Sequence, residues 1–455
     1  MISRDEIDAM GAELGVTAAN VQRNYIFGWL LAGLYGDSPF GERLTLKGGN
    51  AFRKGYFGAT RFSDDLDFTA ADRLDPQQLL DALNEVCRLV QARTGVQFDI
   101  DRNQQLRAQS IDSKKTVYKY KLYFTDFHGK RNNVAIGLRM DVTEFGRLYL
   151  PAQTRNLIHP YSDRAECATG IQVVSLEEGL ADKLKCLLQR RSSFDLFDLV
   201  YSIFVNKDVE VDRLAIVRTF LRKTIFAASP RAALNLLLAV PFDVMRFYWD
   251  SKIVCDRRSR LDFNEAVERF KGELGSMFSS FRSGGLGQLA FFPAEMRTPI
   301  MDAGSSRTLL RITYHGAERL VEPYSLAFKC RKDGVAREYL YVWDCSGGRS
   351  GPGIKAMVNE NVTALEKTDI VFTPRYDIEL AKAGEFADRT TFGSRAGVAV
   401  RRPSTRTGSR SATPRYQVKC GYCNRVFPRS TTSTAMKPHH DPFGNPCYGR
   451  RGYRV

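Results

Sequence analysis

The sequence predicts an α+β multidomain protein, in which a mixed sheet with a helical lobe is followed by a small β-barrel and a metal-binding tail. Residues 1–205 alternate between helix-like runs and runs of period two, as a sheet covered by helices requires. Residues 309–344 contain short alternating segments with a turn at 332–334, which is typical of a small β module. The last 36 residues carry three cysteines at metal-ligand spacing. With 455 residues, 43% of them hydrophobic, the chain can bury two or three cores.

Two stretches poor in apolar residues divide the chain. A Gly/Ser run begins at Ser283, and a Gly/Ser/Thr/Arg-rich stretch without apolar periodicity runs from Arg389 to Arg415, which predicts disorder. We therefore expect five parts: a core with N-terminal helices (1–205), a helical lobe (206–282), a β domain (283–386), a disordered basic linker (387–416) and a metal-binding module (417–455).

Composition restricts both the class of protein and the position of its charged partners. The sequence has no uncharged apolar run of eighteen residues and no signal-peptide pattern, so we expect a soluble cytoplasmic protein without a membrane partner. Nine cysteines without a pairing rhythm argue against a secreted disulfide scaffold. The net charge is +16, and from Arg389 onward fourteen Lys and Arg residues stand against one acid, Asp441. The tail is therefore the surface expected to contact a polyanion.

Helix and strand signals can be placed along the whole first half of the chain. Ser3 and Glu6 have the spacing of a capping box, and a second helix is expected over 17–34. Asp75-Pro76 begins a helix that reaches about residue 91, and Gly95 ends it. Strands are expected over 96–101, 116–127 and 133–145, and helices of the lobe over 211–223, 229–238, 241–250 and 261–281.

The stretch 46–68, LKGGNAFRKGYFGATRFSDDLDF, combines paired glycines with two carboxylates. If DDLDFT is a strand, its period of two points Asp65 and Asp67 to one face, where they can clamp divalent cations beside a triphosphate. Gly48 and Gly49 leave the backbone free of side chains where phosphate must approach. Taken singly, the glycines are also consistent with an ordinary turn, and the aspartates with a solvated strand edge.

A third carboxylate and a pair of helices extend this site. Asp141 stands in an apolar, strand-like run where an unpartnered carboxylate is costly to bury, so it is a candidate third metal ligand or base. The alternative is an exposed, idle Asp at a strand end. In the stretch 173–204, Ser175 caps a helix that carries Lys183, and Ser192-Ser193 marks a break before a second helix. Without further information, Lys183 could equally lie on the polar face of an amphipathic helix.

Three short motifs, Lys47-Gly48-Gly49, Arg61-Phe62-Ser63 and Asp65-Leu66-Asp67-Phe68, together resemble the KGG…RFSxDLDF signature of the AbiEii/AbiGii toxin family of nucleotidyltransferases. The resemblance implies a nucleotidyltransferase-fold mixed sheet and two Mg²⁺ ions held by Asp65, Asp67 and Asp141. It assigns nucleotide binding to a set of residues from these motifs and the later helix: Lys47, Gly48, Gly49, Arg61, Ser63 and Arg190. Asn50 stands where the family often has a hydroxyl residue, and Phe52 where it often has Leu.

The stretch after Ser175 resembles a second motif of the same family, E-x-x-A-x-K…R…D-x-x-D. The matching residues are Glu178, Lys183, Arg190, Asp195 and Asp198. By this resemblance Lys183 contacts the triphosphate or assists proton transfer, and Asp198 orients Lys183 or the acceptor. Phe194 replaces an arginine that often precedes the first of the two acids.

The β domain resembles the WYL domain, a small SH3-like β-barrel that binds nucleic acid or a small ligand. The resemblance is carried by Val321-Glu322-Pro323-Tyr324, Glu338-Tyr339-Leu340 and FTPR at 372–375. Glu338 occupies a tryptophan position and Asn361 a position usually held by arginine. A docking or structural role for this WYL-like domain is therefore the alternative.

The end of the chain has the spacing of a structural zinc site. Cys420 and Cys423 form a C-x2-C pair, which is followed by His439 or His440 and then by Cys447. Cys3His ligation suits tetrahedral Zn²⁺, and so short a segment has too little core to fold without it. The segment resembles a small zinc-finger-like module in which His439 is the better match. Unligated cysteines in an unstructured tail are the alternative.

Basic and aromatic residues near these ligands are typical of a nucleic-acid contact surface: Arg425, Arg429, Arg450 and Arg451, with Tyr422 and Phe427. We therefore predict a Mg²⁺-dependent nucleotidyltransferase toxin, of a type IV toxin–antitoxin or phage-defence pair, that transfers NMP from an NTP to RNA. The expected acceptor is tRNA, and a cognate antitoxin is a candidate partner. The alternatives are a nucleic-acid-binding regulator acting through the WYL-like and zinc-finger modules, and NMP transfer to a protein.

Overall fold

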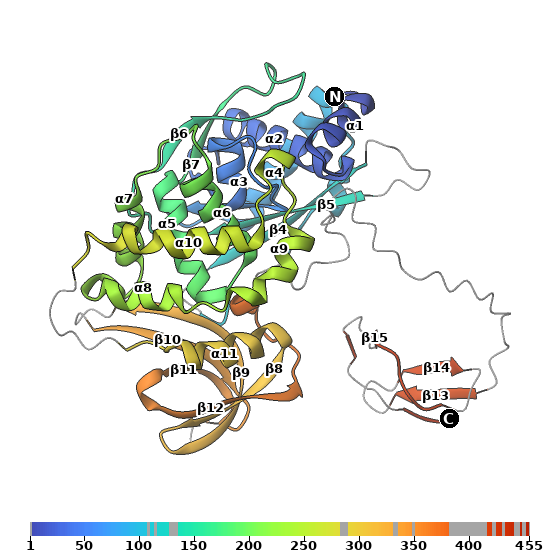
Figure 1. Ribbon diagram of the computed structural model, residues 1–455. Helices are drawn as coiled ribbons and strands as arrows, with labels where there is room; N and C mark the ends of the chain where they lie inside the picture. The colour runs from blue at the N-terminus through green and yellow to red at the C-terminus, as the bar shows by residue number, and fades with distance from the viewer. Residues whose placement is uncertain are drawn as a thin grey trace. The chain divides into compact units, whose positions relative to one another are not determined.

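The computed structural model of the protein is shown in Figure 1. It describes residues 2–106, 110–112, 116–126, 135–282, 290–330, 335–347, 351–381, 416–420, 425–429, 433–440, 446–447 and 452–454. The described chain forms two compact units, Met1–Val398 and Ala399–Val455. The predicted Gly/Ser run at 283–287, the turn at 332–334 and the basic linker at 387–415 lie outside the described residues.

A seven-stranded mixed sheet forms the centre of the first unit, as the sequence predicts. Its strand order is β3-β4-β5-β2-β1-β7-β6, with parallel pairing of β2 with β5 and of β1 with β7. The strands are β1 (Leu44–Lys47), β2 (Asp65–Ala70), β3 (Gln104–Leu106), β4 (Val117–Thr125), β5 (Ala135–Thr143), β6 (Gln153–Asn156) and β7 (Gly170–Val173). The predicted strands at 116–127 and 133–145 correspond to β4 and β5.

The predicted strand at 96–101 is wrong. Phe98 forms only an isolated bridge with Phe124, and the chain then makes a single helical turn over Ile100–Arg102. Gln97 and Asp99 bond to one end of β4, at Thr125 and Tyr123, and after the turn Gln104–Leu106 pairs with Lys119–Lys121. A strand cannot continue through 96–101 because the chain must turn there to reach that position.

The N-terminal helices begin where the capping residues predict, and the second extends three residues beyond its predicted end at 34. The first four helices are α1 (Arg4–Leu14), α2 (Ala18–Asp37), α3 (Gly48–Ala51) and α4 (Pro76–Thr94). The Ser3 side chain accepts a hydrogen bond from the Glu6 amide, and Asp75 caps α4 by accepting from two amides. Gly95 ends α4 with φ +76°. The long helix α2 is buried over most of its length and packs against α4, so it covers the core.

The helical lobe shares its hydrophobic core with the sheet. Its helices are α5 (Leu176–Arg190), α6 (Ser193–Val200), α7 (Arg213–Lys223), α8 (Pro230–Leu238), α9 (Arg246–Lys252) and α10 (Phe263–Phe278). One continuous cluster of buried side chains runs from Ile2 to Phe278, so the sheet, the N-terminal helices and the lobe pack as one body. The predicted break at Ser192-Ser193 is confirmed. The predicted helix at 241–250 begins as a tighter turn, Phe242–Met245, before α9.

A second, smaller sheet forms the β domain. It contains α11 (Ala294–Ser306), β8 (Thr308–Tyr314), β9 (Ala317–Cys330), β10 (Ala336–Asp344), β11 (Gly353–Val358) and β12 (Val362–Val371). The antiparallel order is β11-β10-β9-β8-β12, and α11 packs against the sheet over a core of its own. Among the described strands β11 and β12 remain at opposite edges, so the predicted closed SH3-like barrel is not confirmed.

The second unit is small. Strands β13 (Tyr416–Cys420), β14 (Val426–Arg429) and β17 (Gly452–Arg454) form one sheet, and β15 (His439–His440) pairs with β16 (Pro446–Cys447). Its buried cluster consists of Val418, Cys420, Met436 and Cys447, with Phe427 packed against them. In the described part of the chain, no helix is both long enough and apolar enough to cross a bilayer.

Candidate active site

Three neighbouring strands place charged side chains in lateral register. Lys47 of β1 pairs with Asp67 of β2, and Asp67 pairs with Asp141 of β5. Residues in register on adjacent strands point to the same face of a sheet, and Asp65 shares that face because it is two residues from Asp67. All three aspartates are half-buried. We refer to Asp65, Asp67 and Asp141 as the carboxylate face.

The opposite face of the same strands is apolar. Leu66, Phe68, Met140 and Val142 are at most 3% exposed. Helix α4 lies on that side, because the Tyr120 hydroxyl, which is in register with Met140, donates to the Pro76 carbonyl at 3.1 Å. A one-residue slip would move the aspartates into this core, so burial of the apolar face fixes the register of the carboxylate face.

The two glycines after β1 permit close approach to these carboxylates. Gly48 has φ +72°, and a Cβ there would collide with the Asp67 carboxylate. A Cβ on Gly49 would lie 2.7 Å from Ser63 Oγ and 2.8 Å from Arg61 Nη2. The paired glycines are therefore required by the neighbouring side chains as well as by the turn.

Hydrogen bonds hold the start of β2 in place. The Ser63 hydroxyl donates to Asp65 Oδ1 at 3.2 Å, and Asn50 Nδ2 donates to the Asp65 carbonyl at 2.6 Å. Asp64 instead pairs with Arg23 of α2. Burial raises the pKa of Asp64, and the Arg23 charge opposes that rise. Asn50, a departure from the family motif, thus orients the strand that carries Asp65.

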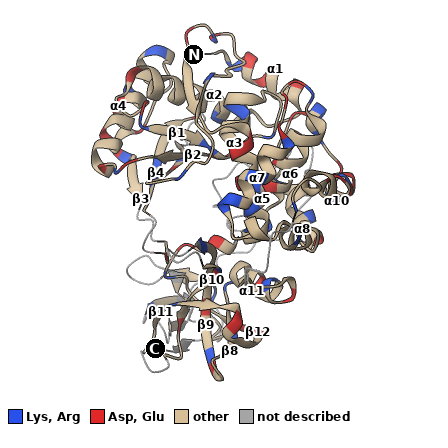
Figure 2. Cartoon of the chain, turned by 90° about the vertical axis from the view of Figure 1, so that its left-hand side faces the viewer, with Lys and Arg blue, Asp and Glu red and all other residues tan. Residues whose placement is uncertain are grey.

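Helices α5 and α6 add a second group of charges, which we call the buried ionic network. Arg61 forms a bidentate pair with Asp198 at 2.7 and 2.8 Å. Lys183 Nζ lies 3.0 Å from Asp195 and 2.8 Å from Asp198, and Arg190 pairs with Asp195 at 2.8 and 2.9 Å. Basic and acidic residues adjoin one another around α5, α6 and α7 in Figure 2.

The charges of this network are balanced within it. Burial acts to raise the pKa of Asp195, but Arg190 and Lys183 hold it well below its ordinary value. Burial likewise acts to lower the pKa of Lys183, and Asp198 and Asp195 reverse that effect and raise it. The pKa of Arg190 is raised, chiefly by Asp195 against burial, and Asp67 contributes. The field of the carboxylate face therefore reaches the network at Arg190.

Two aromatic departures from the family motifs contact these cations. The Arg61 guanidinium lies 4.7 Å from the centre of the Phe194 ring, and Lys183 Nζ lies 5.9 Å from that of Phe52. Both rings support a cation that is already paired with a carboxylate. Phe194 packs on Arg61 at the position where the family motif often has an arginine.

Glu178, which matches the family motif, has structural partners. It is fully buried and accepts hydrogen bonds from the amides of Tyr149 and Leu150 at 3.1 and 3.0 Å. Lys223 of α7 lies 2.6 Å from the same carboxylate. Glu178 therefore joins α5 to α7 and to the loop before β6.

Several charged residues that the sequence analysis did not single out lie on the same face of the sheet as Asp65, Asp67 and Asp141. Lys119 of β4 is in register with Asp141, and Lys121 with Arg139. Lys47, which the sequence did assign to the nucleotide site, lies among them and donates from Nζ to Thr143 Oγ1 at 3.1 Å. The period-two spacing of Lys119 with Lys121, and of Arg139 with Asp141, could have revealed them. These side chains make the face cationic beside the aspartates.

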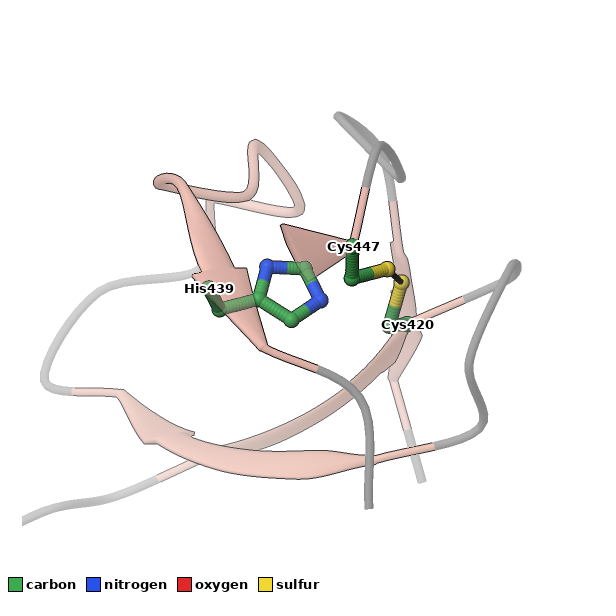
Figure 3. Close-up of side chains that lie close together, drawn as sticks. All are labelled: Cys420, His439 and Cys447. Carbon is green, nitrogen blue, oxygen red and sulfur yellow. Dashed lines mark hydrogen bonds between the residues drawn. The ribbon is translucent and has the colours of Figure 1, made fainter. Parts of the chain in front are cut away.

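A three-ligand cluster lies in the second unit. In the described residues, the only group of three potential metal ligands within 4.8 Å of one another is Cys420, His439 and Cys447. Asp65, Asp67 and Asp141 share one face of the sheet, but their carboxylate oxygens do not form so compact a group of ligands. Figure 3 shows the two sulfurs side by side, with the His439 ring facing them. This Cys2His group is compatible with a metal ion.

The geometry of that cluster is specific. The two Sγ atoms lie 3.7 Å apart and are not joined in a disulfide. His439 Nδ1 lies 2.8 Å from the Lys437 carbonyl, so an Nδ1–H donates there and leaves Nε2 with its lone pair. Cys423 lies outside the described residues, as do Tyr422 and the arginines at 450 and 451. Nothing is described of the His440 and Arg429 side chains.

The first unit belongs to a known class of enzyme. Residues 29–282 match the family described as nucleotidyl transferase AbiEii toxin, type IV toxin–antitoxin system. The match covers more than half of the chain and all eight residues of the carboxylate face and the ionic network, so the protein is a nucleotidyltransferase. It belongs to the AbiEii toxin family, which implies an NTP substrate and a cognate antitoxin.

Among solved structures, the chain is similar to MenT4, a nucleotidyltransferase toxin from Mycobacterium tuberculosis H37Rv. The two are 18% identical, with a TM-score of 0.38, over 62% of this chain and 100% of that chain. No match to this chain is found among curated proteins. The β domain and the second unit lie beyond the family match.

Proposed function

We propose that this toxin is Mg²⁺-dependent and transfers an NMP from an NTP to RNA, with a tRNA 3′ end as the acceptor. The observation that supports this most directly is the register of Lys47, Asp67 and Asp141 on three adjacent strands, with Gly48 against Asp67. This arrangement brings together the Lys47 ammonium, the carboxylates of Asp67 and Asp141, and the glycine backbone at residue 48.

The carboxylate face suits magnesium. Asp65, Asp67 and Asp141 provide hard oxygen ligands, are half-buried, and lie on one face of the sheet. We propose that they hold two Mg²⁺ ions. When bound, such ions supply charge stabilisation at the attacking and leaving oxygens of an in-line transfer.

The nucleotide is proposed to lie against the turn after β1. Gly48, Gly49 and Ser63 would face the triphosphate, and Lys47 would neutralise part of its charge. Arg61 and Arg190 already have carboxylate partners, so their role in nucleotide binding is to hold the loop and the helix end that border the site.

The ionic network restricts the role of Lys183. Because Asp198 and Asp195 raise its pKa, Lys183 stays protonated near neutral pH. This supports a positive charge directed at the phosphates and argues against Lys183 as the group that removes a proton. Asp198 would orient Lys183, and Asp141 remains the candidate for receiving the proton of the acceptor hydroxyl.

An RNA acceptor is supported by the distribution of positive charge. Fourteen Lys and Arg residues lie from Arg389 onward. In the second unit the Arg425 guanidinium lies 5.7 Å from the centre of the Phe427 ring, a pairing suited to phosphate and base contacts. Lys121 and Arg139 add cations to the sheet face of the first unit.

The test is incubation of the purified protein with Mg²⁺, each α-labelled NTP and total RNA. Label on tRNA that is lost with Asp65→Ala and with Asp67→Ala supports the proposal. Label on protein would favour a protein acceptor. If no label is transferred, and truncation at Arg389 abolishes toxicity while Asp67→Ala does not, a nucleic-acid-binding regulator is favoured instead.

We further propose that the metal of the second unit is structural zinc. Two thiolates at about 2.3 Å from a tetrahedral Zn²⁺ lie about 3.8 Å apart, close to the observed 3.7 Å between Cys420 and Cys447. His439 Nε2 would be the third ligand and Cys423 the fourth. Among the described residues of this unit the buried cluster has only four members and one packed ring, and so short a segment has too little core to fold without a metal.

Metal analysis tests the zinc proposal. We expect one zinc per full-length chain, retained through gel filtration and lost with Cys420→Ser or Cys447→Ser. Cys345→Ser, at an exposed cysteine of the β domain, is the matched control and should keep the metal. Zinc content unchanged in the Cys420 and Cys447 variants would contradict the assignment.

A further inference from the structure

The last turn of α5 is bonded to the β domain. This turn ends the helix that carries Lys183 and Arg190 (Figure 2). Three of its residues have partners in the β domain: Arg297 Nη1 donates to the Leu188 carbonyl at 2.6 Å, Gln189 Nε2 donates to the Leu326 carbonyl at 2.7 Å, and Arg191 Nη2 lies 2.6 Å from Asp302. The carbonyls of a helix end lack partners within the helix, so Arg297 supplies one and places a positive charge at the negative end of the helix.

Within this turn, Arg190 belongs to the buried ionic network. Its guanidinium pairs with Asp195, and Asp67 contributes to its raised pKa. Arg191, which follows it, has φ +46°, a left-handed conformation that costs a non-glycine residue about 1–2 kcal/mol. Such a turn keeps its shape only where neighbouring bonds hold it, and here those bonds come from the β domain.

Arg297 is itself held in one orientation. Its Nη2 lies 2.6 and 2.5 Å from the two oxygens of Glu338, and its Nε donates to the Phe292 carbonyl at 2.8 Å. Arg297 is 6% exposed and Glu338 is fully buried. A buried pair of this kind adds little net stability compared with apolar residues, but it specifies geometry. The residue at the tryptophan position of the WYL-like motif thus orients the arginine that caps α5.

The β domain also contacts the other side of the carboxylate face. Lys119, in register with Asp141, lies 2.5 Å from Asp377. Residues 110–112, just before β4, make further contacts with the β domain. Asp112 lies 2.8 Å from Lys329, and the Ser110 hydroxyl donates to Glu379 at 3.2 Å. Ile111 packs in a cluster with Tyr324 and Phe372. The last turn of α5 and strand β4 are therefore both bonded to the β domain, through α11 and β9 on one side and through β9 and residues 372–379 on the other.

We propose that the β domain is a positioning element of the active site: Arg297, oriented by Glu338, fixes the last turn of α5 and thereby the place of Arg190 against Asp195 in the buried ionic network, whose Arg61 lies against Gly49. Arg297 and Glu338 are positioning residues that do not touch substrate. This inference rests on the proposed function, because it assigns Arg190 to the nucleotide site. It gives the β domain a role within the transferase, where the sequence left open nucleic-acid binding, ligand binding and docking.

The experiment is a double-mutant cycle in the full-length protein. Arg297→Met together with Glu338→Gln removes both buried charges and avoids leaving one unpaired. We expect this neutral pair to lower kcat for transfer from α-labelled NTP to total tRNA by about 10- to 100-fold, since small misplacements of binding groups have effects of that size. In an Arg190→Met background the same change should have less than about a twofold effect, because coupled residues are not additive.

Arg311→Met is the matched control, since Arg311 is an exposed arginine of the same domain that pairs only at the surface. It should leave kcat unchanged. A neutral-pair variant with wild-type kcat would overturn the inference. The inference would also be overturned if the neutral-pair change lowered kcat by the same factor with Arg190 present and with Arg190→Met. A general structural defect would lower kcat equally in both proteins.

Amide hydrogen exchange separates this inference from the proposed function. In the neutral-pair variant we expect exchange at residues 187–192 to rise by about tenfold or more, and in Arg311→Met to match wild type. If the wild type transfers no nucleotide at all, the proposed function fails. The exchange rates then still test whether the β domain holds the last turn of α5. Equal protection of 187–192 in the neutral-pair variant and wild type would refute the β domain as the element that holds this turn.

Discussion

The carboxylate face and the buried ionic network contain the same kinds of side chain in opposite settings. In the network, Asp195 and Asp198 are at most 1% exposed and each contacts two cations of the chain. On the carboxylate face, Asp65, Asp67 and Asp141 are half-buried and gathered on one side of the sheet. The carboxylates of the first group are enclosed by the cations they pair with, whereas those of the second remain partly open to solvent, with Lys47 and Lys119 in register with two of them.

This difference suits the buried ionic network to positioning other residues and the carboxylate face to binding the metal ions of the reaction. A fully paired buried network has a single low-energy arrangement, so it can fix the loop of Arg61 and the end of α5. A face with neighbouring carboxylates is costly to the fold and is of use when a cation from solution joins it. Substitutions should therefore affect mainly activity on the carboxylate face, and both stability and activity in the network.

The largest expected effect is on activity, from Asp67→Asn. Loss of a ligand that stabilises transferred charge is worth several kcal/mol, which corresponds to about 10³-fold in rate. The free energy of unfolding should change by less than about 1 kcal/mol, because one like charge is removed from the face. Steady-state transfer assays and urea denaturation measure the two. Asp72→Asn, at an exposed surface pair with Arg43, is the control that should change neither.

In the network, Asp198→Asn should reverse this pattern of effects. It leaves Arg61 and Lys183 without their shared carboxylate, and breaking a buried pair in this way costs about 3–5 kcal/mol. Urea denaturation should show that loss, with a fall in activity beside it. Adding Lys183→Met should restore part of the stability but not the activity. A folded Asp198→Asn protein with wild-type stability would show that the network is not what holds these elements.

Gly48→Ala tests the contact between the two glycines and the carboxylate face. The left-handed backbone costs about 1–2 kcal/mol, and the new Cβ must push the Asp67 carboxylate away. We expect activity to fall by about 10- to 100-fold. Gly95→Ala is a close control, since Gly95 has φ +76° but a Cβ there would meet no atom within 4 Å. It should show the same loss of stability with unchanged activity, and equal activity of the two variants would refute the role of Gly48.

The parts of the site carried by local sequence were predicted correctly in position. The D-x-D strand, the glycine turn, the strand of Asp141 and the helix break at Ser192-Ser193 each follow from a pattern that spans only a few residues. The family resemblance then supplied the class of enzyme, which the family match confirms. Roles of the individual site residues stay predictions until the variants above are measured.

What the sequence could not predict depends on residues far apart in the chain. Arg61 and Asp198 are 137 residues apart, and Arg297 and Leu188 are 109 apart, with no periodicity that links either pair. The strand predicted at 96–101 failed for a related reason, since the helical turn at Ile100–Arg102 interrupts the pairing with β4 before Gln104–Leu106 resumes it. Packing between distant segments decides these contacts, and local patterns do not record it.

The smallest effect is the pH dependence that the network adds to stability. Asp195 has a pKa held below its ordinary 3.8 by Arg190 and Lys183, so its stabilising contribution is complete above that value and is lost as pH falls toward the lower, folded-state pKa. Between pH 5 and pH 3 this one group should remove about 1 kcal/mol of unfolding free energy, because the unfolded state takes up the proton first. Urea denaturation at pH 5, 4 and 3 would show a shallower fall for Asp195→Asn by that amount. Carboxylates of the exposed surface titrate alike in both proteins, so the difference between the two slopes isolates the network. If the free energy of unfolding fell equally with pH in wild type and in Asp195→Asn, the pKa of Asp195 would be the same in the folded and unfolded states. The pairing of charges that distinguishes the network from the carboxylate face would then be refuted.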